Sequence, residues 1–171
     1  YSTVVVLDES SVKTPDDLQG LKIRSTPNPY HIQAFKLLGM NPSPMAIAEL
    51  YTALEVGTFD AQEHPINVTW SAKFYEVQKH LTISNHVYSP LILAMNKAKY
   101  ESLAPDLKKV MDANSGLATS AWLGKTQQGN DAAGRKAAVD RGNTIYQFTA
   151  AEREQFVKLS AQLDDEWVAD M

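Results

Sequence analysis

The hydrophobic pattern predicts strands and helices in alternation along the first part of the chain. Extended segments are predicted at 1–7, 21–24, 42–46 and 58–62, and helices at 15–19, 29–38 and 48–56. In the helix at 29–38, Ile32, Phe35 and Leu38 recur at helical spacing and face a core. Short connections between alternating strands and helices favour a parallel-type sheet flanked by helices, so the predicted fold class is α/β.

The rest of the chain is predicted to contain longer helices. The pattern indicates a helix at 68–80, an apolar strand at 87–95, a long helical region from 105 to about 142, a strand at 144–148 and a terminal helix. Glycines at 116, 124, 129 and 134 favour bends in the long region. Thr149, followed three residues later by Glu152, forms a capping box that marks the start of the terminal helix.

Composition narrows the class of protein. A chain of 171 residues with 44% hydrophobic and 21% charged residues is typical of one globular domain. Its net charge of −4 does not favour a nucleic-acid partner. Cysteine is absent, which excludes disulfides, thiolate nucleophiles and cysteine-ligated metals. The longest apolar run, around 90–95, is far shorter than the ~20 residues that a membrane-spanning helix needs.

Arg24 is the first candidate for a binding role. It lies at the end of a predicted strand, where open α/β sheets bind their ligands, and just before the helix that begins at Asn28. A guanidinium beside helix-end N–H groups suits a carboxylate. The alternative is a surface arginine in a weak ion pair.

A second candidate group follows the strand at 58–62. His64 is predicted in a polar turn, where it could donate to a bound oxygen or titrate near neutral pH. The adjacent Glu63 and His64 also leave open an acid/base or metal pair, and a histidine that simply packs in a turn. His80 is predicted near a helix carboxyl end, where the helix dipole explains it. Without a nucleophile elbow, P-loop or dinucleotide fingerprint, the sequence gives little support to an enzyme or a cofactor.

Three stretches, in order and correctly spaced, resemble a known family. They read KTPDDLQGLKIR, LLGMNPSPMAIAELYTALEVGTFDAQEHP and SAKFYEVQKHLTISNHVYSP, and together cover roughly Lys13–Pro90. They are similar to the periplasmic solute-binding proteins of TRAP transporters, the DctP-like family. The resemblance implies a type II periplasmic-binding-protein fold with two α/β domains about a cleft and a long helix that crosses both. It also implies a periplasmic receptor without a catalytic step, which captures an organic acid for a membrane permease.

The resemblance also implies a set of ligand-binding residues. The arginine of the family's KIR motif binds the ligand carboxylate, and here it is Arg24. The family usually has asparagine before the proline that follows the third strand, and its side chain bonds the ligand; here that position is His64. Asn28 and Ile47 fall where the family also lines its cleft. The resemblance does not identify which acid is bound.

The family's length implies that most of a first domain is absent. The chain begins without methionine or a signal-peptide pattern, so we expect it to be a fragment, whether natural, recombinant or proteolytic. Residues 1–89 and about 130–171 would form the second, ligand-binding domain, and about 90–129 would be a crossover segment of the first. Apolar residues at Leu91–Met95 and Leu117–Trp122 are then expected to be exposed and to drive self-association or swapping. Two alternatives stay open: a small acid/base or metal-dependent enzyme that uses Glu63 and His64, and a ligand-sensing domain of a receptor.

Overall fold

The computed structural model describes residues 3–7, 10–87 and 92–169. In these ranges one sheet of six strands is found, in the order β3-β2-β4-β1-β5-β6. The strands are β1 (Thr3–Leu7), β2 (Lys22–Ser25), β3 (Asn41–Pro44), β4 (Ala61–Pro65), β5 (His80–Ile83) and β6 (Thr144–Gln147).

The sheet is mainly parallel, as the alternating pattern predicts. β2 pairs in parallel with β3 and with β4, and β5 pairs in parallel with β6. β1 is the difference, because it lies between β4 and β5 and runs antiparallel to both. The predicted α/β class and parallel-type sheet are confirmed, with this one antiparallel insertion.

The described helices begin largely where the sequence places caps. They are η1 (Pro15–Leu18), α1 (Pro29–Leu37), α2 (Ile47–Glu55), α3 (Ile66–Ser71), η2 (Phe74–Glu76), α4 (Lys97–Glu101), α5 (Pro105–Ser115), α6 (Leu117–Asp140), α7 (Ala150–Ser160) and α8 (Gln162–Ala169). The Oδ1 of Asn28 accepts hydrogen bonds from the amides of Tyr30 and His31 at the start of α1. The predicted capping box of Thr149 and Glu152 is present at the start of α7.

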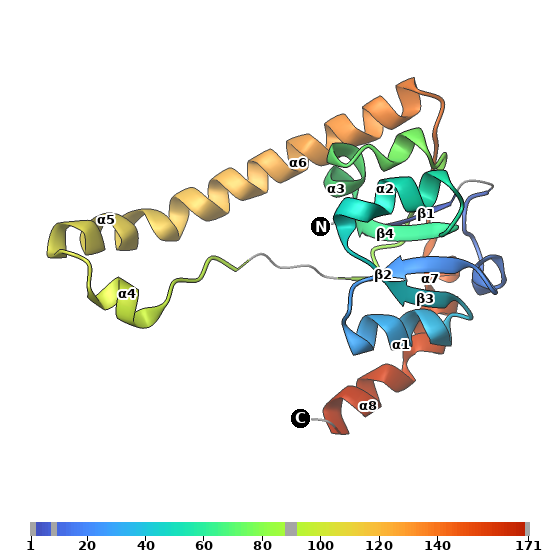
Figure 1. The fold of residues 1–171 in the computed structure, drawn as a ribbon, viewed down its shortest axis with the longest axis horizontal. Coiled ribbons are helices and arrows are strands. Elements are labelled where there is room, and N and C mark those ends of the chain that lie inside the picture. The colour runs from blue at the N-terminus through green and yellow to red at the C-terminus, as the bar shows by residue number, and fades with distance from the viewer. Residues whose placement is uncertain (1–2, 8–9, 88–91, 170–171) are drawn as a thin grey trace.

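Figure 1 shows α1 on one side of the sheet and α2 and α3 on the other. A separate hydrophobic cluster lies on each side. On one face, Ile23 packs with Phe35 of α1, and Phe156 of α7 lies against the same cluster. On the other face, Leu50 of α2 packs with Phe74 of η2. Because side chains alternate along a strand, Ile23 and its neighbour Arg24 point to opposite faces. Arg24 therefore lies on the side of α2 and η2.

The helix predicted at 68–80 is wrong. α3 ends at Ser71, Lys73 takes a left-handed conformation with φ of 60°, and the chain then makes the short η2. His80 opens β5, so it does not lie at a helix end. The apolar residues that suggested one helix pack in two different places. Phe74 enters the core, whereas Trp70 stacks on Tyr75 with ring centroids 4.3 Å apart.

The strand predicted at 87–95 is not found in the described part of this segment. Residues 84–87 and 92–96 have no regular secondary structure, and 88–91 lie outside the described residues.

The long helical region is confirmed as α5 and α6, which are divided at Gly116. α6 continues through the other three glycines over 24 residues. α6 packs against α3 at Gly134, where an added Cβ would lie in ordinary van der Waals contact with the Cβ of Trp70, at 3.4 Å. Figure 1 shows α4, α5 and the start of α6 extending well away from the sheet. Among the described helices, none is both long enough and apolar enough to cross a membrane.

Candidate functional site

Arg24 is held in the middle of the sheet by two hydrogen bonds. It lies in β2 opposite Gln62 of β4, and only 6% of its surface is exposed. Its Nε donates to the carbonyl of Met45 at 2.8 Å, and its Nη1 lies 3.2 Å from the Nε2 of His64. Burial lowers the pKa of the guanidinium, and the charge of Glu63 opposes this shift. Arginine nevertheless stays charged, so the site holds a buried permanent cation.

His64 lies within β4, so its prediction in a turn after the third strand is wrong. The strand was expected at 58–62, but it runs from Ala61 to Pro65. β4 pairs with β1 on one edge and with β2 on the other, and the side chains of Gln62, Glu63 and His64 on its two faces are buried. The result is that His64 and Arg24 lie side by side on neighbouring strands.

The His64 ring sits in a chain of hydrogen bonds that the sequence did not reveal. Its Nδ1 lies 2.5 Å from the Oε1 of Gln62, whose Nε2 lies 3.5 Å from the Oγ1 of Thr69 in α3. The ring of Phe74 is 5.6 Å away, centroid to centroid. Burial, with a smaller contribution from Arg24, lowers the pKa of His64 to about 4 against the opposing charge of Glu63. The spacing of Gln62 and His64, two residues apart on one strand, was the available signal for this contact.

Glu63 engages a different group from that of His64. Its Oε2 lies 3.6 Å from the Nε2 of His86, and the Nδ1 of His86 lies 2.7 Å from the Oγ of Ser84. Burial raises the pKa of the Glu63 carboxyl, but the contact with His86 and the nearby histidine charges outweigh it and lower the pKa below its usual value. Among the described residues, Glu63 pairs with His86, whereas His64 bonds Gln62 and Arg24, so the contacts do not support an acid/base pair of Glu63 and His64. No cluster of three metal-binding side chains is found among the described residues.

In the described residues, Arg24 forms its hydrogen bonds with Met45 and His64 and not with the other two predicted residues. Asn28 is exposed, and its Oδ1 is used to cap α1. It therefore takes up two of the helix-end N–H groups that were expected to face a ligand. Ile47 is the first residue of α2 and is 46% exposed, two positions after the Met45 carbonyl that binds Arg24.

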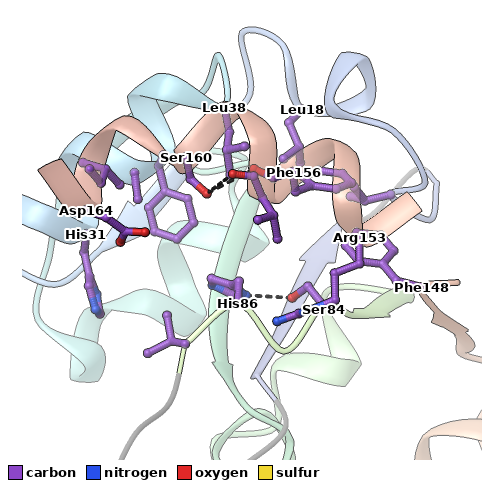
Figure 2. A pocket seen from close by; sticks show the side chains of 16 residues that line it. Leu18, His31, Leu38, Ser84, His86, Phe148, Arg153, Phe156, Ser160 and Asp164 are labelled. Carbon is purple, nitrogen blue, oxygen red and sulfur yellow. Dashed lines mark hydrogen bonds between the residues drawn. The ribbon is translucent and has the colours of Figure 1, made fainter. Parts of the chain in front are cut away.

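A separate cavity lies on the opposite face of the sheet. It has a volume of about 270 Å³ and is lined mainly by apolar side chains of α1, α7 and neighbouring segments. Figure 2 shows Phe156 and Arg153 on the α7 side of this cavity and His86 across from them. None of the four predicted ligand-binding residues lines it. Arg153, His31 and His86 also line this cavity. Arg24 and His64 are the candidate site because they are the predicted residues that the structure brings into contact, at 3.2 Å.

The family model for bacterial extracellular solute-binding proteins, family 7, named DctP, matches residues 5–170. The chain belongs to this family. Its members are binding proteins, so the prediction of a binding protein rather than an enzyme is confirmed, as is the predicted relationship to TRAP transporters.

Individual proteins of this family resemble the chain in sequence and in structure. The 2,3-diketo-L-gulonate-binding periplasmic protein YiaO of Escherichia coli is 55% identical over 63% of this chain. The C4-dicarboxylate-binding periplasmic protein DctP of Rhodobacter capsulatus is 32% identical over 89% of it. A TRAP solute-binding protein of Rhodoferax ferrireducens, solved with copurified benzoate, is 38% identical and superposes on 99% of this chain with a TM-score of 0.84.

The match covers only part of each relative. It spans 33% of the E. coli protein, 46% of the R. capsulatus protein and 54% of the R. ferrireducens chain. The chain thus spans at most about half the length of these relatives.

Proposed function

We propose that this chain is the ligand-binding half of a periplasmic receptor that captures a small organic acid, with Arg24 as the anchor for its carboxylate. The observation that carries the proposal is the buried guanidinium of Arg24 in β2. Among the described residues, its bonds to Met45 and His64 use two of its five N–H groups, which leaves three for a ligand. A carboxylate can accept two of these as a paired, charge-assisted hydrogen bond.

The ligands of the relatives support this chemistry. The names of the E. coli and R. capsulatus proteins specify diketogulonate and C4-dicarboxylates, and the R. ferrireducens structure contains benzoate. These molecules differ in size and polarity, but all carry a carboxylate at neutral pH. A fixed cation that binds this shared group, with the remaining contacts adjusted to the rest of the ligand, accounts for such a range within one family.

The other predicted residues have supporting roles in this proposal. His64 holds Arg24 and lies beside the ligand carboxylate, and Ile47 contributes exposed apolar surface near the start of α2. Asn28 acts at the same edge of the sheet by fixing the start of α1.

The proposal includes a division of the chain between two domains. Residues 1–89 with about 130–171 form one wall of the cleft, and about 90–129 cross to the other domain. The extension of α4, α5 and the start of α6 away from the sheet supports this division. An acid that contacts both walls would stabilise the closed receptor, which then delivers it to a TRAP-type membrane permease.

A thermal-shift panel on the complete receptor tests the proposed class of ligand. Uronates, aldonates, C4-dicarboxylates and aromatic acids would each be compared with the corresponding neutral alcohol or amide. A ligand at 100 times its dissociation constant adds about 2.7 kcal/mol to the free energy of unfolding. We expect at least one acid, and none of the neutral analogues, to stabilise the receptor. Equal stabilisation by an acid and its amide would contradict a carboxylate anchor.

A further inference from the structure

Gln62 is buried beside the proposed anchor without contacting it directly. Its side chain is fully buried in β4, and its Oε1 lies 2.5 Å from the Nδ1 of His64. His64 in turn faces Arg24 through its other ring nitrogen, with 3.2 Å between Nε2 and Nη1. The three side chains therefore form a line from the interior of the sheet to the guanidinium.

The chemistry of arginine fixes the direction of every hydrogen bond in this line. A guanidinium has only donors, so Nη1 must donate and the Nε2 of His64 must accept. A neutral imidazole with an acceptor at Nε2 carries its hydrogen on Nδ1. That hydrogen needs an acceptor, so the atom of Gln62 that faces it is the carbonyl oxygen. The Nε2 of Gln62 then points toward the Oγ1 of Thr69 at 3.5 Å, which is able to accept.

We propose that Gln62 is a positioning residue, which holds His64 in the tautomer that accepts a hydrogen bond from Arg24 and thereby fixes the guanidinium for its ligand. The inference rests on the proposed function of Arg24. With the other tautomer, an N–H of His64 would face an N–H of Arg24, and the guanidinium would lose one of its two holding contacts. A ligand would then have to order the arginine as it binds, which lowers affinity.

The surroundings of His64 favour this neutral, accepting ring. Burial of the ring opposes a positive charge on it and outweighs Glu63 on β4, which favours one; Arg24 on β2 adds a smaller opposition. The ring of Phe74 covers the side toward η2 and offers no polar partner that competes with Gln62.

Two substitutions in the complete receptor test the role of Gln62. Gln62→Leu removes the acceptor of the Nδ1 hydrogen and so disfavours the tautomer that accepts from Arg24; we expect carboxylate affinity to fall about tenfold by calorimetry. Gln62→Glu replaces the amide with a carboxylate that stabilises the doubly protonated ring. We expect its affinity to fall as the pH is lowered from 8 to 5, whereas the wild-type receptor changes little over the same range.

Gln78→Leu is the matched control, because Gln78 is equally buried and its Nε2 donates to the Asp60 carbonyl, away from Arg24. It should lose stability without losing affinity. Nitrogen NMR of the His64 ring gives a readout that does not depend on binding, and it should show the hydrogen on Nδ1 in the wild type. A hydrogen on Nε2, or equal losses of affinity in Gln62→Leu and Gln78→Leu, would overturn the inference while Arg24 remained the anchor. Wild-type affinity in Arg24→Ala would instead overturn the proposed function.

Discussion

Arg24 Nη1 lies 3.2 Å from His64 Nε2, although the two residues are 40 positions apart in the sequence. The contact exists because β2 and β4 are neighbouring parallel strands with Arg24 opposite Gln62. A cation and a neutral imidazole make a favourable pair only if the imidazole accepts and stays unprotonated. Burial lowers the pKa of His64 to about 4, so the ring is neutral near pH 7 and can accept a hydrogen bond from Arg24.

The first prediction concerns how stability depends on pH. The pKa of His64 is 6.5 when unfolded and about 4 when folded, so the unfolded chain binds more protons between these values. Stability is fully present above pH 6.5 and is lost as the pH falls toward 4. Urea unfolding should show that protonation of His64 lowers the free energy of unfolding by about 2 kcal/mol between pH 7 and pH 5.

His64→Asn is the variant that isolates this contribution, since asparagine does not titrate. Its free energy of unfolding should change less than that of the wild type between pH 7 and pH 5. Parallel pH profiles for the two proteins would show that His64 is not held neutral by the fold.

The second prediction concerns the start of α7. The Oγ1 of Thr149 accepts from the amide of Glu152, and the carboxylate of Glu152 accepts from the amide of Thr149. Thr149→Ala should lower the free energy of unfolding by about 1 kcal/mol in urea denaturation. Ser160→Ala is the control on the same helix, because its hydroxyl bonds only carbonyls within α7 and should cost far less. Equal costs for the two variants would contradict a stabilising cap.

Several elements were predictable because local chemistry determines them. Asn28 before Pro29 and Thr149 before Glu152 place two helix starts correctly, since capping depends on neighbours in the sequence. Arg24 was also predicted on the correct strand, because the short apolar and basic run at 21–24 is a local signal.

Other features depend on contacts between distant segments and could not be read from the chain. His64 looks like a turn residue because it is polar and precedes a proline, yet it lies within β4 and its side chain is buried. The antiparallel direction of β1 depends on β4 and β5, which follow much later. The false helix at 68–80 arose because Trp70 and Phe74 keep helical spacing while they pack on different partners.

The third prediction concerns the extended arm formed by α4, α5 and the start of α6. Leu107, Val110 and Met111 on α5 are 50%, 58% and 38% exposed, and Ile92 and Leu93 before α4 are 83% and 68% exposed. The side chains of Leu117–Ala118 and Trp122, which belong to the predicted apolar stripe, lie outside the described residues, as does Leu91. Exposed apolar surface of this kind favours association.

Sedimentation of the 171-residue chain measures this directly. We expect association that increases with concentration, and a Leu107→Lys, Val110→Lys double variant should shift the chain toward monomer. Thr58→Lys, an exposed change on the sheet domain, serves as the charge control. A wild-type chain that remains monomeric at high concentration would refute the expectation.

The most direct test of the central claim is calorimetry of carboxylate binding to the complete receptor with Arg24→Ala and Arg24→Lys. Alanine removes a paired charge-assisted hydrogen bond, so affinity should fall at least about 100-fold. Lysine keeps the charge but not the fork, so it should restore only part of the loss. Arg141→Ala is the control, because this exposed arginine pairs with Glu76 and packs over Tyr75. A large loss is expected only at Arg24, and near-wild-type affinity in Arg24→Ala would contradict its role as the carboxylate anchor.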